Sequence, residues 1–454
     1  MACIITPLKT RSHGKKEHMK PLHIFSSLLF SFPLHSGNFH EIALEQELFR
    51  QYQTNKSSNW YEYLNAKLAQ LPHESTDCYT DTNLLFNNFP TLYGKIPYIS
   101  LGNLPTPLEK LHAISAKTGI EVYIKQDGLS GGFDAQGKQL YGGNKIRKLE
   151  FLLAQARQLG ARKVMTFGCA GSNHAVATAV HAHRLGMQPI CMLLHQPPSH
   201  AVQHNLLMHL DYESELHFNA SNEIRQLNTL LVWLEHYKRD GKAPYIIPTG
   251  GSNVFGTLGF VNAAFELAEQ IKQGIIPTPS HIYVACGSCG TVAGLLLGCM
   301  AAGVKTKIVA IAVEPAALDY FAQKIANLFH ETNALLHGLD NSFPLLEYTD
   351  EHLTIDLHFT GPRYGEFSSE GVRAYHELLE REHIKLDGTY TAKAFAGMLD
   401  RLQKEAHTSV LFWNTYCDLN NTKISESDYS RLPQCLHDYF NEAHIQPLDQ
   451  TEIV

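Results

Sequence analysis

A lysine stands where two glycines end a loop and a predicted helix begins. The glycines are Gly142 and Gly143, and the lysine is Lys145. The start of a helix disfavours a cation, so this position favours an amine that is neutral or covalently bonded, for example by condensation with an aldehyde. The alternative is a solvated lysine beside Arg147 and Lys148, and this segment alone leaves both interpretations open.

Small and polar residues fill the segment 168–174, which follows a predicted strand and precedes a predicted helix. Small side chains let the backbone approach a ligand closely. Ser172, Asn173 and the free N–H groups of the helix start could receive a carboxylate or a phenolate oxygen. Ordinary capping of the helix by Ser172 or Asn173 is the alternative, and for this segment alone it is the better interpretation.

A third segment could bind a phosphate group, because glycines and hydroxyls stand at the start of another predicted helix. Amides and hydroxyls there point at an anion, and the helix dipole favours it. The segment consists of Cys286, Gly287, Ser288, Cys289, Gly290 and Thr291. Its two cysteines also have the spacing of a redox pair, so a dithiol oxidoreductase stays open. Zinc would need a second pair of ligands, which the sequence does not offer at a convincing spacing.

Two tyrosines lie near predicted helix starts. Tyr364 belongs to the polar turn 360–365, and Tyr390 belongs to the turn 386–393. A tyrosine can donate or relay a proton, although packing is the default role for any one of the 20 tyrosines.

The elements that would hold these residues are short apolar runs that alternate with longer amphipathic stretches from residue 98 onward. This rhythm is typical of a parallel sheet covered by helices. The predicted strands are 122–125, 163–167, 189–194, 281–285, 308–313 and 410–413. The predicted helices are 145–159, 173–185, 256–273, 290–302, 369–382 and 392–404, and we expect 333–351 to be irregular. The candidate residues then lie in loops after strands, where such sheets bind ligands.

Length and composition predict a globular protein of more than one domain, with 454 residues of which 44% are apolar and 18% charged. The net charge of -7 gives no basic surplus for binding nucleic acid. The 9 cysteines are scattered, which favours a reducing compartment, and the 26 histidines include no His-Glu-x-x-His motif, so we expect no metal. The apolar run 24–34 is too short and interrupted for a membrane span or an export signal, so we expect a cytoplasmic protein.

The motifs in their joint order resemble those of the fold-type II pyridoxal-phosphate enzymes, and within them the D-cysteine desulfhydrase and 1-aminocyclopropane-1-carboxylate deaminase group. The resemblance covers residues 96–418 and rests on the segments 104–109, 123–127, 142–150, 172–174, 250–253 and 390–393. It implies an α/β protein of two lobes, each a mainly parallel twisted sheet flanked by helices. The implied domains are an N-terminal extension, 1–95, a large cofactor-binding domain, 96–149 with 256–420, a small α/β domain, 150–255, and a C-terminal tail, 421–454.

The resemblance also implies roles for the candidate residues. Lys145 would bind the aldehyde of pyridoxal 5'-phosphate and later move the α-proton of the substrate. Asn173 would bond the phenolic oxygen of the cofactor, and Ser172, Asn173 and His174 would receive the carboxylate of a small amino-acid substrate. The residues from Gly287 to Thr291 would hold the phosphate. Tyr364 and Tyr390 would line the substrate side and steer protons or the leaving group.

One position bears on the reaction. The deaminases carry an acidic residue where this chain has Thr391, placed to bond a protonated pyridine nitrogen. A hydroxyl there, with Thr415 near the same nitrogen, suits β-elimination, in which the leaving thiolate takes the electrons. The resemblance therefore favours a lyase that converts D-cysteine, or a related β-substituted amino acid, to pyruvate, ammonia and sulfide. The deaminase, a serine or threonine dehydratase and a racemase are the nearby alternatives.

This chain also departs from the family pattern. An insertion, 131–141, lies beside the lysine loop, Cys289 replaces a usual glycine, and 414–418 lacks the expected glycines. Besides the dithiol oxidoreductase, a catalytically silent binding protein stays open because the first 95 residues have no counterpart in the family. A homodimer is expected by analogy with the family, with neither nucleic acid nor membrane as a partner.

Overall fold

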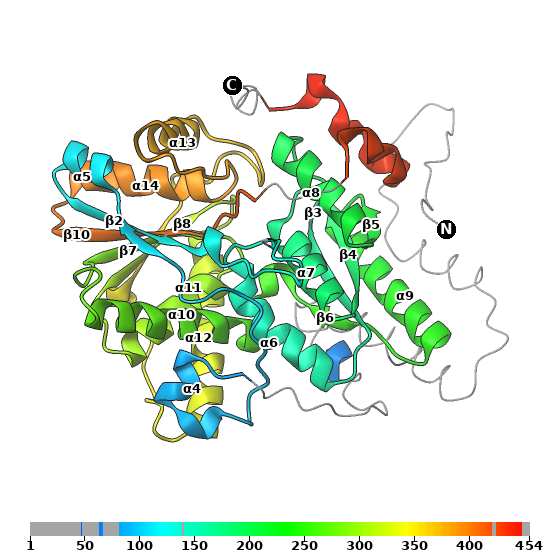
Figure 1. Ribbon diagram of the computed structural model, residues 1–454, viewed down its shortest axis with the longest axis horizontal. Coiled ribbons are helices and arrows are strands. Elements are labelled where there is room, and N and C mark those ends of the chain that lie inside the picture. Colours follow the sequence, from blue (N-terminus) through cyan, green and yellow to red (C-terminus); the bar gives the residue numbers. More distant parts are fainter. Residues whose placement is uncertain (1–46, 48–62, 67–80, 139, 420–423, 447–454) are drawn as a thin grey trace, which may run out of the picture.

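The computed structural model describes residues 47, 63–66, 81–138, 140–419 and 424–446. These residues form two sheets that lie side by side, each flanked by helices (Figure 1). The predicted α/β class with two mainly parallel sheets is confirmed. No helix in this part of the chain is both long and apolar enough to cross a lipid bilayer.

The larger sheet has the strand order β1-β2-β10-β7-β8-β9, and only β1 runs antiparallel to its neighbour. Strand β10 comes from the far end of the chain, yet it pairs in parallel with both β2 and β7. The strand bounds are β1 Leu108–Lys110, β2 Glu121–Gln126, β7 His281–Cys286, β8 Lys307–Ala312, β9 Leu353–Asp356 and β10 Ser409–Asn414.

The alternation of side chains along these strands builds two apolar layers, one on each face of the larger sheet. On one face, Ile282 and Val284 of β7 pack against the helices α10, α11 and α12. On the other face, Tyr283 of β7 packs against α5, α13 and α14, and Figure 1 shows these two helical layers above and below the sheet. The helix bounds are α5 His112–Thr118, α10 Val254–Lys272, α11 Gly290–Ala301, α12 Leu318–Leu339, α13 Ser369–Glu382 and α14 Thr391–Lys404.

The smaller sheet is entirely parallel and has the order β5-β4-β3-β6. Its strands are β3 Lys163–Cys169, β4 Gln188–Leu194, β5 Glu215–Asn219 and β6 Tyr245–Ile247, and its helices are α7 Asn173–Arg184, α8 His200–Asp211 and α9 Asn222–Asp240. Helix α6, Lys145–Gln158, packs against α10 and α7, and its buried apolar residues join the core of the smaller sheet. All four strands fall inside the interval 150–255, although the exact domain boundaries remain a prediction.

Every predicted strand and helix is present, with ends that differ by a few residues. One prediction is wrong: the irregular segment was expected from residue 333, whereas α12 continues to Leu339. Asn333 looked like a loop residue, but its buried side chain donates to Pro344 O at 2.8 Å and accepts from Leu346 N at 2.9 Å. A polar residue that binds the following segment therefore interrupts the apolar pattern without interrupting the helix. The apolar run 24–34 lies outside the described residues, whereas the short helix α4, Leu84–Asn88, within the predicted N-terminal extension, is described.

The C-terminal segment 424–446 folds over the smaller lobe, although the sequence showed no motif there. It consists of short 3-10 helices, Glu426–Arg431, Gln434–Phe440 and Glu442–His444, and Figure 1 shows it in red above α8. Leu432, Leu436 and Tyr439 are buried against α7, α8 and β4. At the end of the segment, Gln446 donates to Gly365 O at 3.1 Å and accepts from Phe367 N at 3.0 Å. This segment, which we call the C-terminal strap, thus bonds to the loop that carries Tyr364.

Candidate active site

The loops that follow several parallel strands meet where the two lobes face each other. The loop after β3 leads to Ser172, the loop after β7 leads to Gly290, and the loop after β10 contains Thr415. In open parallel sheets, ligands bind at the carboxyl ends of the strands. The predicted site residues come from these loops, from the start of α6, from the loop after β9 that carries Tyr364, and from the start of α14.

Lys145 is the first residue of α6 and is only partly exposed. Its Nζ donates to Asn144 Oδ1 at 2.9 Å, and Asn144 Nδ2 donates to Thr291 Oγ1 at 3.2 Å. The Tyr390 ring centre lies 5.9 Å from the same amine. Burial lowers the pKa of Lys145 to about 8, against a weaker opposing effect of Asp387. A lysine, the proposed phosphate loop and a tyrosine are thus brought together, as the sequence predicted.

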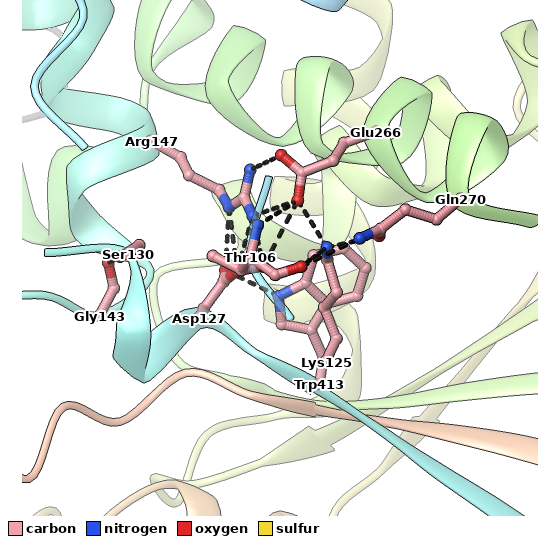
Figure 2. Close-up of polar contacts among 9 residues, drawn as sticks. All are labelled: Thr106, Lys125, Asp127, Ser130, Gly143, Arg147, Glu266, Gln270 and Trp413. Atoms are coloured by element: carbon pink, nitrogen blue, oxygen red, sulfur yellow. Dashed lines mark hydrogen bonds and ion pairs between the residues drawn. The ribbon is translucent and has the colours of Figure 1, made fainter. Parts of the chain in front are cut away.

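A buried cluster of charges holds the start of α6 in place (Figure 2). The Arg147 side chain donates to the carboxylates of Asp127 and Glu266, with contacts of 2.8 to 3.1 Å, and Lys125 donates to Glu266 as well. Two cations thus balance two anions. Burial alone would raise the pKa of Glu266, but the charges and hydrogen bonds of Arg147 and Lys125 bring it down to about 2.

The same cluster fixes the glycine loop. The Gly143 N–H donates to Asp127 O at 3.0 Å, and Ser130 Oγ donates to Gly143 O at 2.9 Å. Gly143 has a φ of 87°, which favours glycine. Arg147 and Lys148 have no exposed surface and Lys145 is only partly exposed, which counts against the alternative of a solvated lysine at this position.

The start of α11 has the features of an anion cradle. Ser288 Oγ lies 2.7 Å from Ser252 Oγ, and the Gly290 N–H donates to Ser252 Oγ at 3.3 Å. Lys148 Nζ, which donates to Ser252 Oγ at 2.9 Å, brings an amine to the same place. Burial and then the charge of Lys145 hold the pKa of Lys148 well below its usual range. An anion bound here would favour the charged amine and raise that pKa again.

The start of α7 presents Ser172 and Asn173 but turns His174 inward. Ser172 Oγ accepts from Ala175 N at 3.2 Å, so its hydroxyl hydrogen stays available as a donor. His174 Nε2 lies 2.9 Å from Thr166 Oγ1 in the interior, and burial holds the pKa of this imidazole well below its usual range. The backbone N–H of His174, rather than its ring, is therefore the group that can face a carboxylate.

The hydroxyls of Tyr364 and Tyr390 are hydrogen-bonded to each other. Burial raises the pKa of both phenols, so each keeps its proton at neutral pH. Thr391 donates its hydroxyl to Asp387 Oδ1 at 2.7 Å, and Thr391 N and Tyr390 N donate to the same carboxylate. The hydroxyl of Thr391 is thus engaged with Asp387. Thr415 lies beside the lysine loop, since its carbonyl accepts from Asn144 N at 3.2 Å.

Four residues of the site were missed as functional residues in the sequence: Tyr141, Lys148, Ser252 and Asp387. Each lies within a segment that was singled out, but its role depends on a partner far away in the chain. Lys148 and Ser252, for example, are 104 positions apart. No local pattern could reveal such a pair.

The dithiol alternative loses support because Cys286 and Cys289 are both buried, at 1% and 2% exposure, with their sulfur atoms 4.0 Å apart. An external disulfide could not reach either thiol without opening the loop. Among the described residues, no group of three or more His, Cys, Asp or Glu side chains could hold a metal ion.

The fold and this site define a pyridoxal-phosphate protein. Residues 99–415 match the family of pyridoxal-phosphate dependent enzymes, and the chain belongs to that family. It is 33% identical over 326 residues to the D-cysteine desulfhydrase of Serratia proteamaculans (strain 568), a match that covers 70% of this chain and 92% of the relative. The D-cysteine desulfhydrase of Klebsiella pneumoniae (strain 342) is also 33% identical, over 68% of this chain and 90% of its own.

A solved structure described as an ACC deaminase homologue is similar to this fold. It is 32% identical, has a TM-score of 0.62, and the match covers 79% of this chain and 100% of the other. Together these likenesses confirm the predicted fold-type II architecture. The C-terminal strap lies beyond the residues that match the family.

The donor set fits pyridoxal phosphate. A primary amine with a pKa of about 8 suits an aldehyde, and the cradle at the start of α11 suits a dianionic phosphate. The cradle also leaves no room for a larger residue at position 290, because a Cβ there would lie 2.6 Å from Ser252 Oγ and 3.0 Å from Lys148 Nζ. Lys145 would bind the cofactor covalently, and the cradle with Lys148 would hold its phosphate.

Proposed function

We propose that the protein is a lyase that removes the β-substituent of a small amino acid, with D-cysteine as the first candidate substrate. The reaction takes D-cysteine and water to pyruvate, ammonia and hydrogen sulfide. The names of the desulfhydrase relatives support this substrate. A cytoplasmic homodimer is part of the same proposal.

The observation that carries the proposal is that the start of α14 presents no free negative charge. Position 391 carries a hydroxyl instead of an acidic side chain, and the nearby carboxylate of Asp387 already accepts from Tyr390 N, Thr391 N and Thr391 Oγ1. No free carboxylate is therefore presented from this helix start to stabilise a protonated ring nitrogen. Elimination tolerates a weaker electron sink than cyclopropane opening, because the leaving sulfur departs with its electron pair.

The residues of the site then divide the work of elimination. Pyridoxal phosphate, when bound, supplies an electron sink that makes the α-hydrogen of the substrate acidic. Lys145 Nζ takes the α-proton, since its lowered pKa leaves part of the amine free at neutral pH. Ser172 Oγ and the first N–H groups of α7 bind and orient the substrate carboxylate.

The tyrosine pair can protonate the leaving sulfur. Tyr364 and Tyr390 hold two hydroxyl hydrogens between them, and their mutual hydrogen bond uses one. The other can be donated from a phenol oxygen to the thiolate as it leaves. Because burial raises the pKa of both phenols, neither is ionised at neutral pH.

A substrate panel tests the proposal. The purified protein, loaded with pyridoxal phosphate, is given D-cysteine, L-cysteine, β-chloro-D-alanine and 1-aminocyclopropane-1-carboxylate, and pyruvate, 2-oxobutanoate and sulfide are measured. We expect pyruvate and sulfide in equal amounts from D-cysteine, and none from a Lys145→Ala variant. 2-Oxobutanoate from the cyclopropane substrate alone would replace the lyase with the deaminase, the second candidate, which the solved homologue supports. A protein that binds the cofactor but turns over none of the four would be a silent binding protein.

A further inference from the structure

The insertion beside the lysine loop delivers a phenol to the start of α7. Tyr141 is the last residue of this insertion and is only 4% exposed. Its OH lies 3.0 Å from Asn173 Oδ1, and its carbonyl accepts from His181 Nε2 at 3.1 Å. Helix α7 thus holds Tyr141 by both its main chain and its side chain.

The orientation of the Asn173 amide follows from a chain of hydrogen bonds. Asn205 Nδ2 donates to the carbonyl of Gly171 at 2.9 Å. A carbonyl can only accept, so this end of Asn205 must be the NH2 group. The same NH2 group lies 2.8 Å from the Asn173 side chain, which must therefore present its oxygen there.

The Tyr141 hydroxyl must then be the second donor to that oxygen. With two donors on its oxygen, Asn173 turns its own NH2 group the other way, and among the described residues this NH2 group donates to no partner. Two donors on one amide oxygen also polarise the amide and strengthen the N–H groups as donors.

The surroundings place this arrangement at the active site. Burial, followed by the charges of neighbours that include Asp387, holds the pKa of Tyr141 well above its usual range. The charge of Asp387 also opposes the lowering of the Lys145 pKa by burial. The charge of Lys145 in turn adds to burial in lowering the pKa of His174, the neighbour of Asn173. Tyr141 also lies only four residues before Lys145 while its OH bonds to Asn173, so the phenol links the lysine loop to the start of α7.

We propose that Tyr141 and Asn205 are positioning residues that fix the Asn173 amide as a donor to the phenolic oxygen of the cofactor. This inference rests on the proposed function, because it needs pyridoxal phosphate in the site. It also assigns a role to the insertion, which supplies one of the two donors.

Binding of two cofactor forms to the apoprotein tests the inference. One is pyridoxal phosphate and the other is its 3-deoxy analogue, which lacks the phenolic oxygen. We expect Tyr141→Phe to weaken the binding of pyridoxal phosphate about three- to ten-fold, which corresponds to the loss of one hydrogen bond. The affinity for the analogue should stay unchanged. The control is Tyr283→Phe, which removes another buried phenol, in β7, whose OH lies 3.5 Å from His407 Nε2, and it should change neither affinity.

The outcomes separate the possible failures. The inference would be overturned if Tyr141→Phe lowered the affinities for both ligands equally, or changed neither affinity. If Tyr141→Phe does not fold, Asn205→Leu removes the other donor and should show the same selective loss. A wild-type apoprotein that binds neither form would instead overturn the proposed function.

Discussion

The amine of Lys145 illustrates how burial prepares a nucleophile. At its ordinary pKa of 10.5, a lysine would be free in only about one molecule in 3000 at pH 7. The lowered pKa of about 8 makes that fraction roughly one in ten, because burial disfavours the charged form. The position at the start of a helix, which suggested this from the sequence, acts in the same direction.

The pH dependence of covalent cofactor attachment should follow this pKa. Only the free amine attacks an aldehyde, so we expect the rate constant for attachment to the apoprotein to rise with pH, with a midpoint near 8, and then to level off. Borohydride trapping followed by peptide mapping measures the rate at Lys145.

The mapping is needed because burial also lowers the pKa of Lys393 to about 8. The control is the Lys145→Ala variant, in which the labelled peptide that contains position 145 should disappear. A midpoint near 10.5 would show that the amine is solvated in the apoprotein.

At the scale of the elements, the helix starts determine what the site can bind. Helix α11 begins with Gly290, and the close approach of Ser252 and Lys148 leaves no room for a larger residue. The loop before it also contains Cys289 with a φ of 70°, a backbone conformation that L residues rarely adopt. The cradle is therefore restricted both in the space left for side chains and in the backbone conformation that its loop adopts.

Gly290→Ala should weaken the binding of pyridoxal phosphate by about five- to 150-fold, because moving Ser252 or Lys148 away costs about 1 to 3 kcal/mol. The affinity of the apoprotein for inorganic phosphate should fall in parallel. Gly338→Ala, in helix α12 with no atom within 4 Å of the new methyl group, should leave both affinities unchanged. If Gly290→Ala binds both ligands as the wild type does, the anion is held elsewhere.

The local part of this architecture could be predicted from the sequence. The bounds of α13, 369–382, were predicted correctly, because an apolar face repeats at helical spacing behind the capping residue Ser368. Lys145, Asn173 and Tyr390 were singled out as candidates because each lies next to a glycine or polar turn. In contrast, Lys148 acts through its bond to Ser252 and Asp387 acts through its charge on Lys145, both far away in the chain. Asn333 was misread because its side chain bonds to the segment that follows the helix.

At the scale of the whole molecule, the C-terminal strap connects the two lobes. Its apolar residues, among them Leu436 and Tyr439, are buried on the smaller lobe, whereas Gln446 bonds to the loop 363–367 that follows the larger sheet. Gln446 also bonds to the carbonyl of Pro198 on the smaller lobe. The strap thereby fixes the loop that carries Tyr364.

Gln446→Ala should impair catalysis more than stability. The loss of its hydrogen bonds should free the Tyr364 loop and lower kcat by about three- to ten-fold, with a small change in Tm. Steady-state kinetics with the best substrate of the panel and a thermal melt measure the two effects. The control is Gln273→Ala, whose side chain bonds only to Glu269 on the surface of its own helix, and which should change neither. An unchanged kcat for Gln446→Ala would show that the loop holds its position without the strap.

The place of β10 has a consequence for biosynthesis. Because β10 lies between β2 and β7, those two strands cannot be bridged until residues 409–414 have left the ribosome. Until then, a nascent chain several hundred residues long carries two open strand edges, which are ready templates for aggregation. We therefore expect this protein to need chaperones during translation, and ribosomes stalled before residue 409 to carry chains that are sensitive to protease across the larger sheet.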